Sequence, residues 1–94
     1  MEGEYEVFTY PVPKLPKLIR NKLGKEKAWG LFDGDNVITL DERLKGKKEL
    51  IVTIHEFIHW LHPEWTENQI IKDSETIAEF LWKQHYRKVD NDDK

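Results

Sequence analysis

Two histidines and a glutamate stand close together in VTIHEFIHWLHPEW, residues 52–65. His55, Glu56 and His59 have the spacing H-E-x-x-H. On a helix, His55 and His59 lie on the same face and can present two imidazole nitrogens to one zinc ion. Glu56 points about 100° round the helix from His55, which suits a general base that takes a proton from the metal's water. The segment therefore predicts a zinc site with Glu56 as its catalytic base.

The spacing is rare enough to be informative. With 4 His in 94 residues, chance gives about 0.02 such motifs in this chain. Its position on a predicted amphipathic helix, just after a predicted strand hairpin, strengthens the interpretation. The alternative is a helix whose histidines are ordinary boundary residues that need no metal.

A catalytic zinc usually has three protein ligands and a water, so a third ligand is expected. The candidates lie after His59: His62, Glu64, Glu67, Glu75 and Glu79. His62 lies about 10 Å along the helix axis from His55, too far to share a metal with it. We interpret His62 as a polar helix end before Pro63.

The choice among the carboxylates depends on the phase of the second predicted helix. Its apolar stripe is centred near Ser74, so Glu67 falls inside the stripe, Glu75 at its border and Glu79 toward solvent. A carboxylate inside a buried stripe needs a partner, and zinc would be one. An acidic residue in the first turn, favoured by the helix dipole, is the other interpretation of Glu67. We predict Glu67 as the third ligand and keep Glu75 as the alternative.

The elements that position these residues follow from periodicity and turn signals. Alternation in EYEVFTY predicts a strand at 4–10, and the apolar spacing of PKLIRNKLG predicts a short helix at 16–24. Two β-prone runs, 28–32 and 36–40, flank Asp-Gly-Asp and predict a hairpin.

Two longer helices follow, and the first of them carries the histidines. Apolar residues at helical spacing predict a helix from about 47 to 61, which ends because the residue before Pro63 avoids the α region. A capping box of Thr66 and Gln69 begins a second helix, which runs to about residue 87. The expected class is α+β: a small antiparallel sheet, from the N-terminal strand and the hairpin, packed on the motif helix and a C-terminal helix. We expect one domain over 1–94, with 88–94 as a solvated tail.

Composition narrows the classes of partner. The net charge of −3 and the pI near 5.8 argue against a nucleic-acid-binding surface. Cysteine is absent, so neither disulfides nor thiolate ligands can stabilise the fold. No apolar run approaches the ~20 residues that span a bilayer, and the acidic start is unlike a secretory signal. We expect a soluble cytoplasmic protein with no nucleic-acid or membrane partner.

The segment ITLDERLKGKKELIVTIHEFIHWLHPEWTENQI resembles short zinc metallopeptidase-like domains of the zincin clan, including minimal gluzincin, ImmA/IrrE-like and SprT-like forms. The resemblance covers about residues 29–87. It implies that His55 and His59 are zinc ligands and Glu56 the general base, and its Thr66-Glu67 pair supports Glu67 as a ligand. The chain lacks an SprT-type downstream histidine and a metzincin-type Gly turn, which leaves the subclass open.

The expected function is a zinc-dependent metalloendopeptidase, in which zinc-activated water attacks the peptide bond and Glu56 is the base. The resemblance also implies a peptide or protein substrate bound along an edge strand at Val37–Leu40, by strand addition. Two alternatives share the metal: a non-catalytic zinc-binding interaction module with a zincin-like fold, and hydrolysis of another amide.

Overall fold

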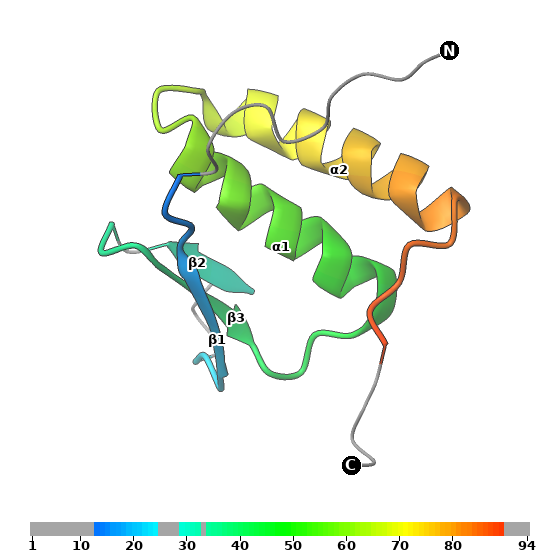
Figure 1. Cartoon of the computed structure of the whole chain (residues 1–94), viewed down its shortest axis with the longest axis horizontal. Coiled ribbons are helices and arrows are strands. Elements are labelled where there is room, and N and C mark those ends of the chain that lie inside the picture. The colour runs from blue at the N-terminus through cyan, green and yellow to red at the C-terminus, as the bar shows by residue number, and fades with distance from the viewer. Residues whose placement is uncertain (1–12, 25–28, 33, 90–94) are drawn as a thin grey trace.

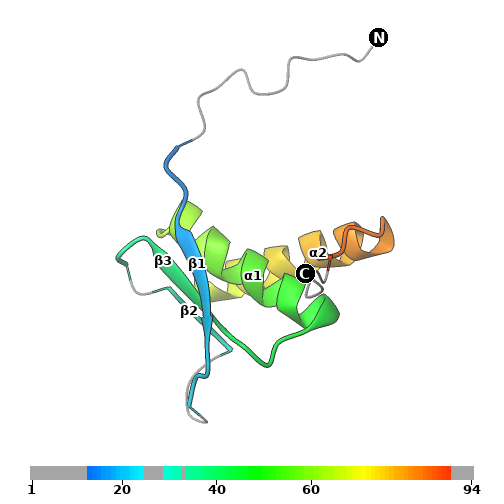
Figure 2. The ribbon, with the colours of Figure 1, turned by 60° about the horizontal axis from the view of Figure 1, so that its bottom comes forward.

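The computed structural model describes residues 13–24, 29–32 and 34–89, which form three strands and two helices (Figure 1). In chain order they are β1 (Lys17–Asn21), β2 (Gly30–Phe32), β3 (Val37–Asp41), α1 (Gly46–Leu61) and α2 (Glu67–Lys83). Helix α1 is the middle layer: it contacts β2 and β3 as well as α2, while α2 contacts no strand among the described residues. Figure 2 shows both helices on one side of the sheet. The predicted α+β class, a small sheet on two helices, is confirmed.

The strand order is β1-β3-β2, and this order corrects two predictions. Strands β1 and β3 are parallel and β2 and β3 antiparallel, so the described sheet is mixed and not purely antiparallel. Strand β3, which contains Val37–Leu40, pairs on both sides and is the central strand. The prediction that Val37–Leu40 is an edge open to a peptide is wrong, because its backbone groups are already used by β1 and β2.

The helix predicted at 16–24 is also wrong, because Lys17–Asn21 forms β1. Leu18 pairs with Ile38 in register and packs against the core, while Lys17, Ile19 and Asn21 are exposed. A helix of nine residues is marginal by itself. Pairing with β3 gives this segment backbone hydrogen bonds along one side and lets Leu18 pack against the core.

The other predicted elements within the described residues form close to the expected bounds. The hairpin joins β2 to β3, with Gly34 (φ 90°) and Asn36 (φ 64°) in its turn. Helix α1 ends at Leu61 with His62 as its C-cap, and α2 stops at Lys83, four residues before the expected end near 87. The strand predicted at 4–10 and residues 90–94 of the predicted tail lie outside the described residues.

The buried core has two parts, one on each side of α1. Between the sheet and α1, Ile38, Leu40 and Leu44 are buried against partly buried neighbours that include Val52 and Phe57 of α1. Between the helices the buried residues are Ile58 of α1 and Ile70, Ser74 and Ala78 of α2. Among the described residues, no helix has both the length and the apolar character that a membrane span requires.

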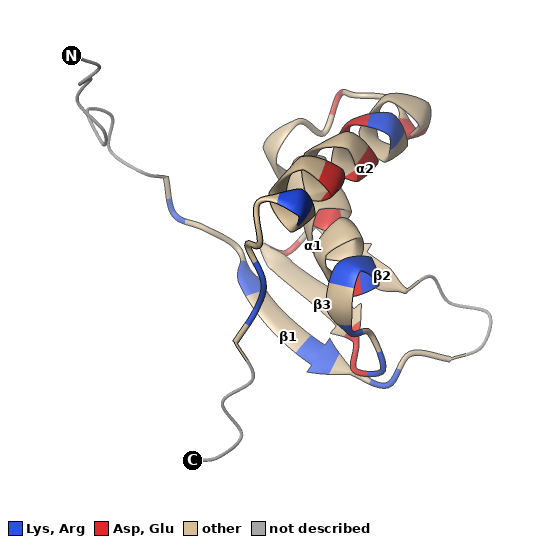
Figure 3. Cartoon of the chain, turned by 90° about the vertical axis from the view of Figure 1, so that its right-hand side faces the viewer, with Lys and Arg blue, Asp and Glu red and all other residues tan. Residues whose placement is uncertain are grey.

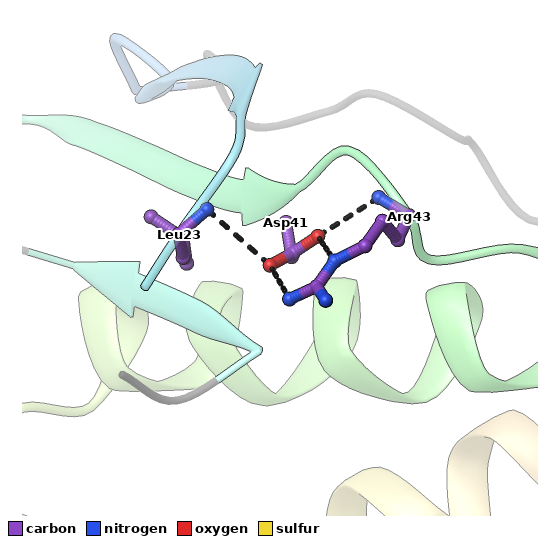
Figure 4. A network of polar contacts seen from close by, with 3 residues as sticks. All are labelled: Leu23, Asp41 and Arg43. Carbon is purple, nitrogen blue, oxygen red and sulfur yellow. Dashed lines mark hydrogen bonds and ion pairs between the residues drawn. The ribbon is translucent and has the colours of Figure 1, made fainter. Parts of the chain in front are cut away.

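Asp41, at the end of β3, fixes the turn into α1 (Figure 4). Its carboxylate is 2% exposed and accepts hydrogen bonds from the Arg43 guanidinium (2.8 and 2.7 Å) and the backbone N–H groups of Arg43 (2.9 Å) and Leu23 (3.3 Å). These donors hold the pKa of Asp41 well below its usual range, chiefly through the Arg43 side chain. The network ties the ends of β1 and β3 together near the start of α1.

Candidate metal centre

The start of α2 lies beside the C-terminal half of α1 because a short turn, His62–Thr66, joins the two antiparallel helices. Thr66 is the N-cap of α2, and its hydroxyl accepts a hydrogen bond from the Gln69 N–H (3.2 Å). The Gln69 side chain donates to Asp73 (2.8 Å), so only the Thr66 half of the predicted capping box forms. The cap makes Glu67 the first helical residue of α2.

The two motif histidines and Glu67 converge across this helix pair. His55 Nε2 lies 3.1 Å from Glu67 Oε2, and His59 Nε2 lies 3.0 Å from Glu67 Oε1. The imidazole rings meet edge to face, with centroids 4.9 Å apart. One ligand atom from each of the three residues lies within 4.8 Å of the others. This group of two nitrogens and a carboxylate can hold a metal ion.

The surroundings of Glu67 differ from the prediction in one respect. Its side chain is 58% exposed, whereas helical phase placed it inside the buried stripe. The side chains of His55 and His59 are 18% and 31% exposed. The three residues therefore form a shallow site that is open to solvent, and the carboxylate is held by the histidines instead of by burial.

The other candidate ligands lie elsewhere. His62 stacks on Trp65 (centroids 3.9 Å apart, planes 6° apart), and its Nδ1 lies 3.6 Å from a Glu64 carboxylate oxygen. Glu79 forms an ion pair with Lys47 at the far end of the helix pair. Glu75 is exposed and does not belong to the ligand group. Of the five candidate third ligands, the structure brings only Glu67 to His55 and His59.

Glu56 lies on the sheet side of α1 and is 7% exposed. Burial raises the pKa of its carboxyl, and the nearby Glu67 carboxylate raises it further, while His55 and His59 act in the opposite direction. A glutamate with a raised pKa is closer to the value that a general base needs near neutral pH. Glu56 is absent from the ligand group, as its place in the motif predicts.

A cleft of about 340 Å³ joins Glu56 and His59 to the exposed edge of the sheet. It is lined by these two residues, by Pro63 and by the whole of β2, which has β3 on one side only among the described strands. The cleft is a space in which a ligand could meet both Glu56 and His59.

Gly30 also lines this cleft, although it was not among the residues predicted for the site. A Cβ atom at Gly30 would lie 2.7 Å from Val52 Cγ1 and 2.8 Å from Glu56 Cγ. Only glycine lets β2 approach α1 this closely, with Glu56 between them. An isolated glycine within a predicted strand often marks such an approach, and this signal was present in AWGLF.

Comparison with protein-family models, with curated proteins and with solved structures gives no match for this chain.

Proposed function

We propose that this protein is a zinc-dependent metalloendopeptidase. The observation that carries the proposal is the convergence of His55, His59 and Glu67 beside a buried Glu56, in a cleft bordered by a sheet edge. In this arrangement, three side chains can bind a metal ion, and a fourth, Glu56, can accept and donate a proton.

The donor set fits zinc. Catalytic zinc sites commonly use two histidines and a carboxylate, leaving the fourth position to water. A tetrahedral ion with bonds of about 2.0–2.2 Å keeps its donor atoms about 3.3–3.5 Å apart. His55 Nε2 and His59 Nε2 lie 3.1 and 3.0 Å from two different oxygens of Glu67, and one ligand atom from each residue lies within 4.8 Å of the others. Side-chain rotations would therefore bring one oxygen and both nitrogens to the spacing that the ion requires. When bound, zinc would supply Lewis acidity that polarises a carbonyl and makes water more acidic.

Glu56 would act as the general base and then as the general acid. Its carboxylate would accept a proton from a water in the cleft and later deliver that proton to the leaving amine of the scissile bond. Burial supports this role in two ways: it raises the carboxyl pKa, and it keeps the group's orientation fixed between α1 and β2. His55, His59 and Glu67 would hold the ion in place.

We propose that a peptide substrate adds to the sheet along the side of β2 that pairs with no other described strand. Strand β2 lines the cleft, and an extended peptide can hydrogen bond to an open strand edge. Leu31, in the middle of β2, is 47% exposed and offers an apolar contact. The peptide would then run past Glu56 and His59.

The test is cleavage of fluorescently labelled unfolded casein by the zinc-loaded protein and by Glu56→Gln. The variant keeps the size of the side chain but removes the base, so cleavage should fall by a factor on the order of 10² to 10⁴ while zinc content and folding stay unchanged. Glu75→Gln is the matched control, since it makes the same change in charge at an exposed residue outside the cleft, and it should cleave normally. Equal cleavage by wild type and Glu56→Gln would contradict the proposed mechanism.

The short edge strand favours one other function, a non-catalytic zinc-binding interaction module. Strand β2 has three residues and offers few backbone groups to an incoming peptide. A wild-type protein that holds zinc firmly yet cleaves nothing in a broad peptide library would favour the module over the peptidase.

A further inference from the structure

A second hollow lies at the end of the helix pair away from the metal centre. It has a volume of about 670 Å³, within the roughly 300–1,000 Å³ of typical ligand sites. Its walls come from the start of α1, from the end of α2 with the residues after it, and from Arg20 of β1. We call this hollow the α1–α2 end groove. Figure 3 views this end of the molecule and shows Lys and Arg segments on β1, at the start of α1 and after α2.

A helix-ending motif directs the chain after α2 into the groove. The Tyr86 N–H donates to Leu81 O and the His85 N–H to Trp82 O, both at 3.0 Å. With His85 in the left-handed region (φ 68°), these bonds form a Schellman motif. The motif reverses the chain direction at His85, so Tyr86 and Arg87 line the groove beside Trp82.

Arg87 lies over the ring of Trp82. Its guanidinium carbon lies 3.6 Å from the centre of the Trp82 ring, so the plane of the group is held by the ring face. Stacking uses the face of the guanidinium and leaves its N–H donors free at the edges. None of the described residues accepts a hydrogen bond from Arg87 or forms an ion pair with it. The donors can therefore bind a carboxylate from outside, with both oxygens engaged.

The remaining charges of the groove also favour an anion. Arg20 and Glu49 form an ion pair (2.9 Å) and largely neutralise each other. Among the described residues, the groove is then lined by Lys45, Arg87 and Lys88 against one carboxylate, that of Glu42. Within the described part of the chain, neither lysine has an ion-pair partner.

The floor of the groove is apolar. Leu44 is buried, and Leu50 and Trp82 are partly buried between the helices. Tyr86 is 65% exposed at the rim, and tyrosine, tryptophan and arginine are the residues that most often carry the affinity of an interface. An occupant that covers this surface needs an apolar side chain close to its negative charge.

We propose that the α1–α2 end groove binds a peptide segment in which an aspartate or glutamate stands next to an apolar side chain. The carboxylate pairs with Arg87, and the apolar side chain packs on Trp82 and Leu50. A peptide also supplies amide N–H groups for the Glu42 carboxylate and carbonyl groups for Lys45 and Lys88. A simple organic acid offers only the first two of these interactions.

The test uses the full chain and two capped tetrapeptides, acetyl-Ala-Phe-Asp-Ala-amide and its Asn counterpart. Blocked ends leave the Asp side chain as the only carboxylate. Titrations followed by amide and indole NMR shifts should place the Asp peptide at Trp82, Tyr86 and Arg87, and the Asn peptide should bind about tenfold more weakly. Shifts confined to His55 and His59, or equal affinity for both peptides, would overturn the proposal.

Two variants distinguish binding in the groove from nonspecific attraction by the net charge of the protein. Arg87→Gln should weaken the Asp peptide about tenfold and leave the Asn peptide unchanged. Lys83→Gln makes the same change in charge at a side chain that is 70% exposed and does not line the groove, and it should bind both peptides like wild type. Equal weakening by the two variants would show attraction by net charge alone. Equal affinity for 3-phenylpropionate and the Asp peptide would overturn the proposal that the groove binds a peptide.

Discussion

Substitution of Gly30 by alanine tests how closely β2 packs against Glu56. Backbone entropy predicts that the variant is more stable than wild type, whereas packing predicts that it is less stable. In an unconstrained strand, replacing glycine by alanine stabilises the fold by about 0.5–1 kcal/mol, because alanine loses less backbone entropy on folding. At Gly30 the new Cβ would lie 2.7 Å from Val52 Cγ1, 2.8 Å from Glu56 Cγ and 3.1 Å from Glu56 Oε2. Carbon atoms in contact prefer about 3.5–4.0 Å, so the neighbours must move by about 1 Å.

Overpacking of this kind costs about 1–3 kcal/mol. For a domain of this size, each kcal/mol changes the melting temperature by about 4–8 °C. After the entropy gain is subtracted, the net cost is up to about 2.5 kcal/mol, so we expect Gly30→Ala to melt below wild type, by up to about 10–20 °C, in a circular dichroism scan. The displaced Glu56 carboxylate should also lower peptide cleavage by about 10²-fold, as about 1 Å of misplacement can.

A second substitution checks that the effect comes from the predicted contact. Val52→Ala removes the nearest atom, so the double variant Gly30→Ala, Val52→Ala should be more stable than the sum of the single effects by about 0.5 kcal/mol or more. A Gly30→Ala protein that melts at or above the wild-type temperature would refute the packing argument.

Three further predictions concern stability. Free zinc at about 100 times its dissociation constant should stabilise the fold by about 2.7 kcal/mol, so chelation should lower the melting temperature by about 10–20 °C; an unchanged melt after verified zinc removal would show that the metal does not stabilise the fold. The depressed pKa of Asp41 means that its ionised form stabilises the fold above its unfolded pKa of about 3.9, and this contribution is lost as pH falls through the lower folded value. In urea melts of the metal-free protein, the stability gap between wild type and Asp41→Asn should be constant from pH 5 to 7 and shrink below about pH 4; a constant gap down to pH 3 would contradict the assignment. His85→Gly should raise the melting temperature by about 2–8 °C, because glycine adopts the positive φ of this position without the steric cost of a side chain; a lower melting temperature would contradict the Schellman geometry.

The sequence predicted the two helices well because their signals are local. Helical spacing of apolar residues, Pro63 after His62 and the Thr66 cap each act within a few residues, and the structure has α1 and α2 close to the predicted bounds. The H-E-x-x-H spacing is likewise local: its geometry on a helix follows from helical pitch alone.

The errors concern features that depend on distant partners. Residues 17–21 have apolar spacing that suits a short helix, but their state is decided by pairing with Val37–Asp41, which no local pattern reports. The same pairing makes β3 central, so that β2, beside the cleft, has β3 as its one partner strand among the described residues. The periodicity of the second helix predicted that Glu67 is buried. Its closeness to His55 and His59 depends instead on how the turn between the helices places them side by side. The closeness of Gly30 to Glu56 is also a contact between distant segments.

The most direct test of the proposed site is the zinc affinity of wild type, Glu67→Gln and Glu75→Gln, measured by competition with a chromophoric chelator and checked by elemental analysis. The two variants make the same change in the same helix, but only Glu67 contacts His55 and His59. We predict one zinc per chain and equal affinity for wild type and Glu75→Gln. Glu67→Gln should bind more than about 100-fold more weakly, since changes next to metal ligands already cost about 10–100-fold. Wild-type affinity in Glu67→Gln, or loss of zinc in Glu75→Gln, would contradict the assignment of the site.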